Sequence, residues 1–308
     1  TGGAGFIGSH LTRSLLARGG SVRVIDDFSN GKRENLLDLE ESHREALEVH
    51  ELDIRDAKAL APIFDGVRNV FHQAAVPSVQ RSIQDPVNSC TANMIGSLNV
   101  LLAARDAGVR KVVYASSSSV YGDTETLPKH EGLPVSPLSP YAISKAAAEM
   151  LAKVFPGIYG LETVGLRYFN VFGPYQDPES QYAAVIPRFI TSLLAGKSPT
   201  VYGDGEQTRD FTFIDNVVSA NLLAAESDAA GISANIACGD RFSLNDLMRT
   251  LNEILGTDIS AIYEEGRVGD VRDSQADVSY ASEQFGFEPL VDFKEGLRRT
   301  VAWYRDNA

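Results

Sequence analysis

Tyr141 and Lys145 are the two residues whose types and spacing most directly indicate chemistry. They are four residues apart in the segment YAISKAAAEMLAKVF, whose apolar pattern predicts a helix. Both side chains therefore lie on one face of that helix, one turn apart. A tyrosine with a pKa of about 10 is a poor base at neutral pH. A neighbouring ammonium group favours the phenolate and brings the pKa of Tyr141 toward the working range.

A run of four serines, residues 116–119, adds hydroxyl groups to this pair. The run ends the apolar segment KVVYASS, which predicts a strand, so the serines lie at the carboxyl end of that strand. A hydroxyl there can share a hydrogen bond with the substrate oxygen that Tyr141 reaches. YxxxK occurs by chance in many chains, and the nearby serines favour a catalytic pair over a solvated tyrosine and lysine.

Gly2, Gly5 and Gly8 in the opening segment TGGAGFIGSH predict a phosphate-binding turn that begins a helix. The GxxGxxG spacing is a weak signal, so its context carries the prediction. The helix offers unpaired backbone N–H groups and the positive end of its dipole to a pyrophosphate. Asp26 ends the next predicted strand, where a carboxylate can bond the ribose hydroxyls of an adenosine. A carboxylate there repels an additional 2′-phosphate, which favours NAD over NADP.

Two alternatives stay open around this turn. Lys32 and Arg33 follow Asp26 closely, and their charges keep NADP as a second interpretation. Asp53, at the end of the following predicted strand, is either an adenine contact or an ordinary turn acid.

Short apolar runs and helical segments alternate over the first 170 residues. Strands are predicted at residues 22–26, 47–54, 69–75, 111–117 and 162–169, and helices after the glycine turn and at residues 56–64, 93–108 and 141–155. Helices between such strands imply right-handed crossovers and a parallel sheet. We therefore predict an α/β fold with a Rossmann-type doubly wound parallel sheet.

The strand that should precede the glycine turn is missing from the sequence. In this fold it lies at the centre of the sheet, so we expect the sequence to begin inside the mature protein. Without that strand the central ladder is unfilled, and we expect the chain to be poorly stable.

Beyond Asn170 the alternation loosens, which predicts a smaller C-terminal substrate domain beside the strand ends. We assign residues 1–170 and 207–237 to the NAD-binding domain and residues 171–206 and 238–308 to the substrate domain. Because open α/β sheets bind ligands at the carboxyl ends of their strands, a cleft between the domains is the expected site.

Composition excludes several classes of function. The 308 residues carry a net charge of −13, and nucleic-acid binding requires a basic face. No apolar run is long enough to span a membrane, and no secretory signal opens the sequence, so we expect a cytoplasmic protein with no membrane partner. Cys90 and Cys238 fit no metal or redox spacing, and the five histidines form no metal motif. We predict free thiols and no metal.

Five segments together resemble a known family: TGGAGFIGSH, SSSSVYG, YAISK, LRYFNVFGP and RDFTFIDNV. They are similar to motifs of the extended short-chain dehydrogenase/reductase family and, within it, of the UDP-hexose 4-epimerases. The resemblance covers the whole chain apart from the first strand. It implies a redox reaction with no net oxidation. A proton leaves the sugar 4-hydroxyl while a hydride passes from carbon 4 to NAD, and the resulting ketone turns over. The hydride then returns to its other face.

The resemblance also implies roles for individual residues. Tyr141 is the base and acid, Lys145 tunes it and holds the nicotinamide ribose, and Ser117 bonds the reacting oxygen. Ser116 and Ser118 are alternatives for that last role. The implied NAD-binding residues are Gly2, Gly5, Phe6, Ile7, Gly8, Asp26, Asn30, Asp53, Ile54, Ala74, Ala75, Asn93, Tyr141, Lys145 and Tyr168.

On the substrate side, the resemblance implies a firmly held UDP. The positions that match UDP contacts are Asn170, Arg209, Arg267 and Asp270. A guanidinium suits a diphosphate because its planar fork pairs two oxygens at once. The alternative for Arg209 is an ordinary surface arginine.

Ser274 and Ser78 bear on the choice of sugar. Ser274 matches a position that bounds the pocket near the 2-substituent, where a serine leaves room for an N-acetyl group. Ser78 matches a position that can contact that group. The resemblance thus favours UDP-N-acetylglucosamine, with UDP-glucose also accepted. The alternative is that Ser274 fills space without selecting.

Other interpretations stay open. A UDP-glucuronate epimerase or decarboxylase shares the fold and the Tyr-Lys pair. A 4,6-dehydratase typically carries an acidic pair just before the VYG segment, and SSSSVYG has none. A non-enzymatic NAD- or nucleotide-sensing module need not keep Tyr141, Lys145 and the serines together. The resemblance also implies a homodimer formed through a pair of long helices.

Overall fold

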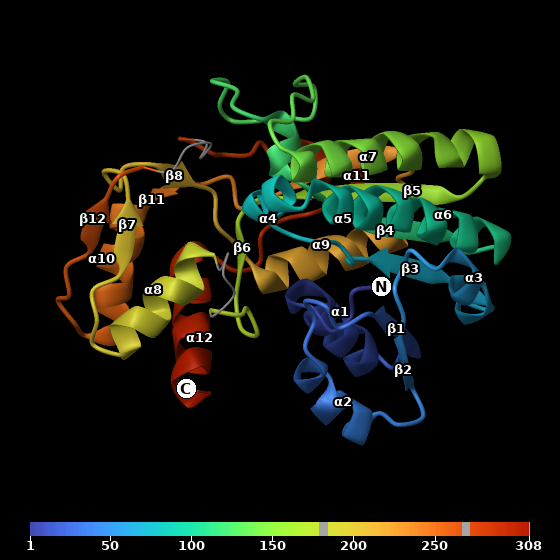
Figure 1. Ribbon diagram of the computed structural model, residues 1–308, viewed down its shortest axis with the longest axis horizontal. Coiled ribbons are helices and arrows are strands. Elements are labelled where there is room, and N and C mark those ends of the chain that lie inside the picture. Colours follow the sequence, from blue (N-terminus) through green and yellow to red (C-terminus); the bar gives the residue numbers. More distant parts are fainter. Residues whose placement is uncertain (179–183, 267–271, 308) are drawn as a thin grey trace.

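A parallel sheet with helices on both faces organises the larger part of the molecule (Figure 1). The computed structural model describes residues 1–178, 184–266 and 272–307. The strands of the main sheet are, in spatial order, β10 (Ile232–Ile236), β5 (Glu162–Tyr168), β4 (Lys111–Ser117) and β3 (Asn69–His72), all parallel. A parallel pair, β1 (Val22–Asp26) and β2 (Leu47–Glu51), lies beyond β3. The predicted α/β, Rossmann-type fold is confirmed.

Helices alternate with these strands along the chain, as predicted. They are α1 (Phe6–Ala17), α2 (Leu37–Ser42), α3 (Ala57–Leu60), α4 (Val79–Gln84), α5 (Pro86–Cys90), α6 (Ser97–Asp106), α7 (Pro140–Tyr159) and α9 (Ile214–Glu226). Shorter turns are η1 (Arg33–Asn35), η2 (Ala61–Phe64), the π-helix η3 (Thr91–Gly96) and η4 (Ser118–Tyr121). In α7 the Ser139 side chain caps the first turn, Pro140 occupies its first position, and Gly160 ends the helix with a φ of 72°.

The predicted bounds are correct for β1 and β4 and too long for β2 and β3. Val112, Val113 and Val164 are fully buried, as expected for strands covered on both faces. Residues 52–54 and 73–75, predicted as strand, leave the ladder and line a cavity instead. The carboxyl ends of these strands therefore contribute to a ligand site rather than to the sheet.

Thr1 and Gly2 connect the β1–β2 pair to the main sheet. The Thr1 amine donates to Phe71 O at 2.9 Å, Gln73 N donates to Thr1 O at 3.0 Å, and Gly2 N donates to Ile25 O at 2.7 Å. A cavity of about 570 Å³ lies between β1 and β3, lined by these strands and by α1. The expectation that a further strand occupies this place stays a prediction, as does the low stability of the chain without it.

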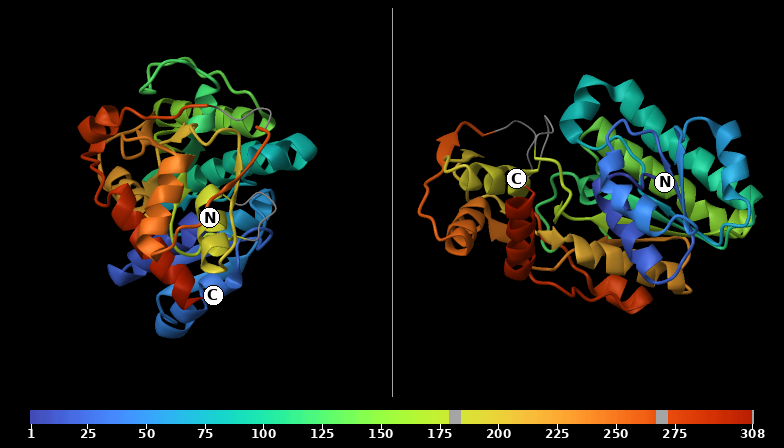
Figure 2. Two further views of the ribbon diagram at one scale, coloured as in Figure 1. Left: turned by 90° about the vertical axis from the view of Figure 1, so that its left-hand side faces the viewer. Right: turned by 90° about the horizontal axis from the view of Figure 1, so that it is seen from below.

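A second region packs at the carboxyl ends of the strands, on the left of Figure 1. Its helices are α8 (Val185–Leu194), α10 (Leu244–Leu255) and α12 (Phe293–Asp306), whereas α11 (Ser279–Phe285) packs beside β10 of the main sheet. Its short strand pairs are β7 (Thr200–Tyr202) with β12 (Ile262–Glu264), β8 (Thr208–Arg209) with β11 (Phe242–Ser243), and β6 (Val171–Phe172) with β9 (Thr212–Phe213). Figure 2 shows most of this region to one side of the sheet.

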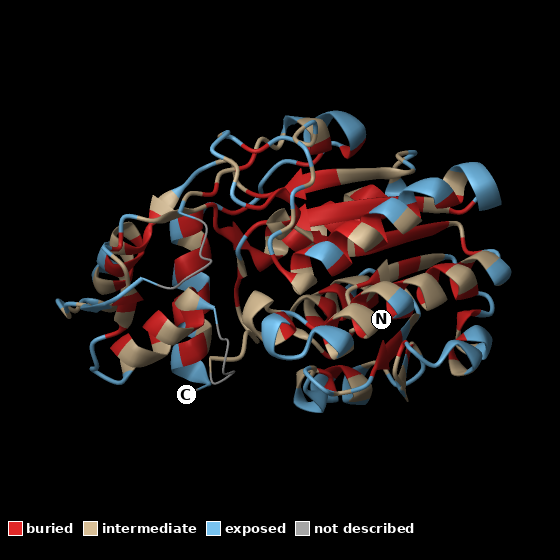
Figure 3. Ribbon diagram, turned by 45° about the horizontal axis from the view of Figure 1, so that its top comes forward, coloured by how far each residue is buried: buried red, intermediate tan, exposed pale blue. Residues whose placement is uncertain are grey.

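One hydrophobic core runs from the sheet into the second region. It includes Val164 of β5, Ile186 of α8 and Leu247 of α10. Phe293 of α12 stacks on Phe242 with ring centroids 4.2 Å apart. Figure 3 shows the buried strands covered by helices whose outer residues are exposed. Because the two regions share this core, the predicted division into domains stays an interpretation.

None of the helices in the described part of the chain is both long and apolar enough to cross a bilayer.

Candidate active site

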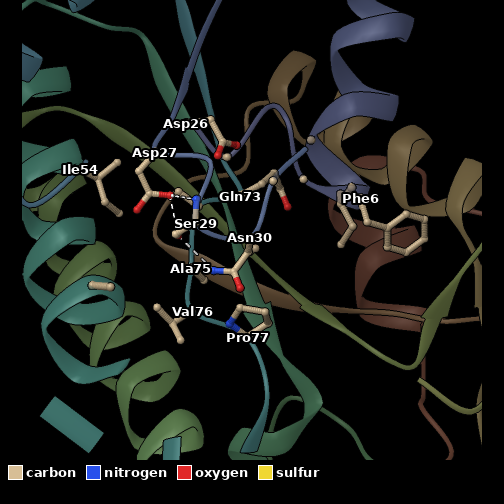
Figure 4. A pocket seen from close by; sticks show the side chains of 18 of the residues that line it. Phe6, Asp26, Asp27, Ser29, Asn30, Ile54, Gln73, Ala75, Val76 and Pro77 are labelled. Atoms are coloured by element: carbon tan, nitrogen blue, oxygen red, sulfur yellow. Dashed lines mark hydrogen bonds between the residues drawn. The ribbon is translucent and has the colours of Figure 1, made fainter. Parts of the chain in front are cut away.

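A cavity of about 790 Å³ lies at the carboxyl ends of the strands. Its wall is formed by the glycine turn, the loop after β1, the ends of β2 and β3, and the start of α7. Figure 4 shows Phe6 and Ile54 on opposite sides of it, with Asp26 and Asp27 between them. The predicted cofactor residues line this cavity with one exception, Asn93.

The glycine turn has no room for side chains at two of its glycines. A Cβ on Gly8 would lie 2.0 Å from Gly2 O, and a Cβ on Gly2 would lie 2.5 Å from Ala74 N. Gly2 also has a φ of 71°, which disfavours other residues. Within the described residues, no side chain caps the helix that begins after Gly5. The first-turn N–H groups therefore form a cradle that suits a pyrophosphate.

Asp26 ties the glycine turn to the loop after β1. Its carboxylate accepts from Ala4 N at 2.9 Å and from Phe28 N at 3.0 Å, and burial raises its pKa. Asp53 lines the same cavity and also accepts from Arg55 N at 2.8 Å. The Arg55 guanidinium holds the pKa of Asp53 below its usual value. Asp53 is therefore a turn acid that also lines the cavity, and its contact with an adenine stays a prediction.

Asn93 is buried behind the cavity wall. Its side chain accepts from Val76 N at 2.7 Å and donates to Val76 O at 3.1 Å and to Ser144 Oγ at 3.0 Å. It lies in the π-helix η3, a widened turn that often marks a functional position. Asn93 does not line the cavity itself but holds the backbone of Val76, which does; its predicted contact with the cofactor stays a prediction.

Tyr141 and Lys145 line this cavity together with Ser116, and Ser117 lies beside Tyr141. Lys145 Nζ lies 5.9 Å from the centre of the Tyr141 ring and donates to Ala115 O at 2.9 Å. The Ser117 hydroxyl hydrogen-bonds to the Tyr141 phenol. Ser116 instead donates to the buried carboxylate of Glu149. Of these two serines, Ser117 is therefore the one that meets the phenol.

Burial acts on the pKa values of both Tyr141 and Lys145. Burial raises the pKa of Tyr141, and the hydrogen bond from Ser117 opposes this rise only in part. Burial also lowers the pKa of Lys145 to about 8, while the Glu149 carboxylate opposes that change. Burial penalises both charged forms more than the neighbouring groups of the protein favour them. The expectation that Lys145, together with the positive charge of a bound nicotinamide, brings the pKa of Tyr141 toward the working range stays a prediction.

A second cavity of about 240 Å³ adjoins the first, since Ala184 lines both. Asn170, Arg188 and Arg209 contribute polar groups to its wall. The Arg209 guanidinium donates to Thr208 O at 2.8 Å and to Arg272 O at 3.0 Å, and this half-buried residue is not an ordinary surface arginine. The cavity therefore presents two guanidinium groups to an anionic ligand.

The remaining predicted substrate residues have different outcomes. Ser78 lines the larger cavity. Ser274 is buried, its N–H donates to Thr208 O at 3.1 Å, and it lies outside the described lining of both cavities. Arg267 and Asp270 lie outside the described residues.

Lys32 and Arg33, whose charges left NADP as a second interpretation, each have a carboxylate partner. Lys32 pairs with Asp177 at 3.1 Å, and Arg33 pairs with Glu40 at 3.1 Å. Lys32 and Asp177 both line the larger cavity, so their pair crosses from the loop after β1 to the loop after β6. Because these carboxylates balance the two cations, the positive charge near a 2′-phosphate of NADP is lower than the sequence alone indicates.

A family model described as "NAD dependent epimerase/dehydratase family" matches residues 1–237. The chain belongs to this family. Its cofactor is NAD, and the cradle of Gly2, Gly5 and Gly8 with Asp26 beside it fits that group.

Individual relatives of this epimerase/dehydratase chain span nearly its whole length. It is 39% identical to the UDP-glucose 4-epimerase of Mycolicibacterium smegmatis, over 100% of this chain and 98% of the relative. It is 42% identical to a UDP-N-acetylglucosamine 4-epimerase from Methanobrevibacter ruminantium M1 in complex with UDP-N-acetylmuramic acid, with a TM-score of 0.95 over 100% and 97% of the two chains. It is 40% identical to a UDP-glucose 4-epimerase with UDP-glucose from Thermotoga maritima, with a TM-score of 0.94 over 99% and 97%.

Several residues of the epimerase/dehydratase site were missed by the sequence analysis. In the larger cavity they include Asp27, Phe28, Ser29, Gly31, Gln73, Val76, Pro77, Arg81, Gln176 and Asp177. Many of them directly flank predicted residues, so extending each motif by a few positions finds them. Arg188 of the smaller cavity lies on α8, and its presence in one cavity with Arg209 depends on tertiary packing that no local pattern reveals.

Replacing Gly8 with alanine tests the cradle. The added Cβ forces the turn open, so we expect NAD affinity to fall by at least ~10-fold. Gly157→Ala is the matched control, because a Cβ there meets nothing within 4 Å. Calorimetric titration with NAD, together with a thermal melt of each variant, measures the effect. Unchanged NAD affinity in a folded Gly8→Ala variant contradicts the proposed cradle.

Proposed function

We propose that this protein interconverts the two C4 epimers of a UDP-hexose. The favoured pair is UDP-N-acetylglucosamine and UDP-N-acetylgalactosamine, with UDP-glucose and UDP-galactose also accepted. One observation carries the proposal: Tyr141, Ser117 and Lys145 are clustered at the NAD cavity, and that cavity adjoins a second one lined by two arginines.

Tyr141 is the group that exchanges a proton with the sugar 4-hydroxyl. Its phenol is buried and hydrogen-bonded to Ser117, so the serine can orient both the phenol and the reacting oxygen. Lys145 supplies a positive charge near the phenol, 5.9 Å from the ring centre. NAD, when bound, takes up and returns the hydrogen of carbon 4. The buried chain groups exclude water while the sugar is in its ketone form.

Arg188 and Arg209 support the binding of the UDP part. Two planar guanidinium groups in one cavity match the paired oxygens of a diphosphate. The hexose then extends toward the NAD cavity at Ala184, which lines both spaces. A firmly held diphosphate allows the hexose to present each face in turn without leaving the protein.

Turnover without added cofactor tests the proposal. Purified protein incubated with UDP-N-acetylglucosamine should form UDP-N-acetylgalactosamine, measured by chromatography. In Tyr141→Phe we expect the rate to fall by at least ~100-fold, since the general acid and base is removed. Tyr159→Phe, at an exposed position of the same helix, should keep full activity.

Other outcomes of this assay favour other functions. Full activity of Tyr141→Phe contradicts the assignment of the phenol. Net accumulation of NADH indicates a dehydrogenase instead. Conversion of UDP-glucuronate in preference to the neutral sugars favours the uronate epimerase or decarboxylase, and ligand binding without turnover of any sugar favours a sensing module.

Ser274 is proposed to admit the N-acetyl group. Two observations support this: Ser274 matches the family position that bounds the pocket near the 2-substituent, and the chain is similar to a UDP-N-acetylglucosamine 4-epimerase. A tyrosine at this position should lower kcat/KM for UDP-N-acetylglucosamine by at least ~10-fold relative to UDP-glucose, because it fills space near the 2-substituent. Ser274→Ala is the control and should leave the ratio unchanged. An equal change for both sugars in Ser274→Tyr contradicts the proposal.

We also propose that two copies associate through α7 and its neighbours. Met150, Val154 and Ile158 lie on one face of α7 and are 63%, 47% and 64% exposed. Ile83 of α4 and Val87 of α5 are also exposed, and both helices contact α7. An exposed apolar face of this kind marks an interface. When two copies pair through it about a two-fold axis, each copy buries the face of the other.

Light scattering on a sizing column tests this dimer. We expect the wild type to have the mass of two chains and Met150→Glu to have the mass of one, because the carboxylate has no partner in an apolar interface. Leu290→Glu is the control, since Leu290 is 68% exposed but lies outside this face. A wild-type monomer, or a Met150→Glu dimer, rules the proposal out.

A further inference from the structure

Glu149 is a buried carboxylate that has no place in the reaction described above. It follows Lys145 by one turn of α7 and is 6% exposed. It accepts from Arg167 Nε at 2.9 Å and from Arg167 Nη2 at 2.7 Å, and it also accepts from the Ser116 hydroxyl. Its hydrogen bonds therefore reach both β4, which carries the serines, and β5.

Arg167 is held in turn by groups on its other side. Its Nη1 donates to the Tyr121 hydroxyl at 2.9 Å, and Tyr121 donates to Asn235 Oδ1 at 2.7 Å. Asn235 Nδ2 then donates to Lys129 O at 2.9 Å. The guanidinium is thus fixed against Glu149, and the ammonium of Lys145 lies one turn of α7 before the same carboxylate.

The surroundings of Lys145 contain few charges. Its Nζ has one backbone acceptor, Ala115 O, and Glu149 is the carboxylate whose charge favours its protonated form. Among the described residues, the titratable and charged groups that face Lys145 or its partners are Tyr141 and Glu149 of α7, Tyr114 of β4, His72 of β3, Arg167 and Tyr168 of β5, and the Thr1 amine. Burial keeps His72 neutral by lowering its pKa, so it adds no competing charge.

We propose that Glu149 is a positioning residue that keeps Lys145 protonated, and that Arg167 limits how strongly it does so. This inference rests on the proposed function only where Lys145 assists Tyr141. A carboxylate one turn away favours the ammonium, and the opposing guanidinium withdraws part of that effect. The pair therefore sets the pH above which Lys145 loses its charge.

The two members of the pair should move the pKa of Lys145 in opposite directions. Glu149→Gln removes the favourable charge, so the pKa of Lys145 should fall below its value of about 8. Arg167→Met leaves the carboxylate unopposed, so that pKa should rise. We expect shifts of about one pH unit, a tenfold change in the protonated fraction well above the pKa.

Nuclear magnetic resonance of protein labelled with nitrogen-15 lysine measures this directly. The Lys145 ammonium signal, assigned by its absence in Lys145→Met, is followed against pH with NAD present. The alkaline limb of kcat/KM is measured in parallel, and it should move to lower pH in Glu149→Gln and to higher pH in Arg167→Met. Because the resonance arm needs no turnover, it tests the inference even if epimerisation is not observed.

A double variant allows the test even if the single variants do not fold. Removing one partner of a buried ion pair leaves an uncompensated charge, whereas replacing both by apolar residues is much less damaging. Glu149→Met with Arg167→Met should fold and should show a lowered pKa of Lys145. A purely structural role lowers the melting temperature of the single variants and leaves the pKa of Lys145 unchanged. Such a result, or shifts of the same sign in both single variants, overturns the inference.

Discussion

The cost of burying the Lys145 ammonium constrains much of the structure around the NAD cavity. A charged group removed from water is tolerated only when nearby dipoles and opposite charges compensate it. Here Ala115 O and Glu149 provide that compensation, and Glu149 in turn requires Arg167. Arg167 requires Tyr121. One buried cation is therefore linked to polar positions on α7, β4, β5 and η4.

The second constraint is the meeting of two cavities of different character. The larger one lies in the sheet region, and its wall includes the glycine turn, where the backbone can approach a ligand closely. The smaller one belongs to the second region and presents long cationic side chains. Ala184 connects them just before α8 begins. The shared core across both regions makes this junction a fixed part of the molecule rather than a hinge between independent units.

Much of the fold and part of the site follow from local sequence. The alternation of apolar strands and helices, the cap and stop residues of α7, and the one-turn spacing of Tyr141 and Lys145 depend only on neighbouring residues. The contact of Asn93 with Val76 did not follow, because it depends on a π-helical turn that no sequence pattern marked. The effect of burial on the pKa of Tyr141 did not follow either, since burial is a property of the whole fold. Arg188 was missed for the same reason.

The ion pair between Lys32 and Asp177 has a consequence for how cofactor is retained. Its side chains are 54% and 36% exposed, so water and salt screen it, and such a pair contributes about 0–1 kcal/mol. That energy corresponds to about a fivefold change in an equilibrium constant at most. The pair therefore contributes little to holding a cofactor in the cavity. Tight binding of NAD would depend on the buried contacts deeper inside, at the glycine turn and at Asp26.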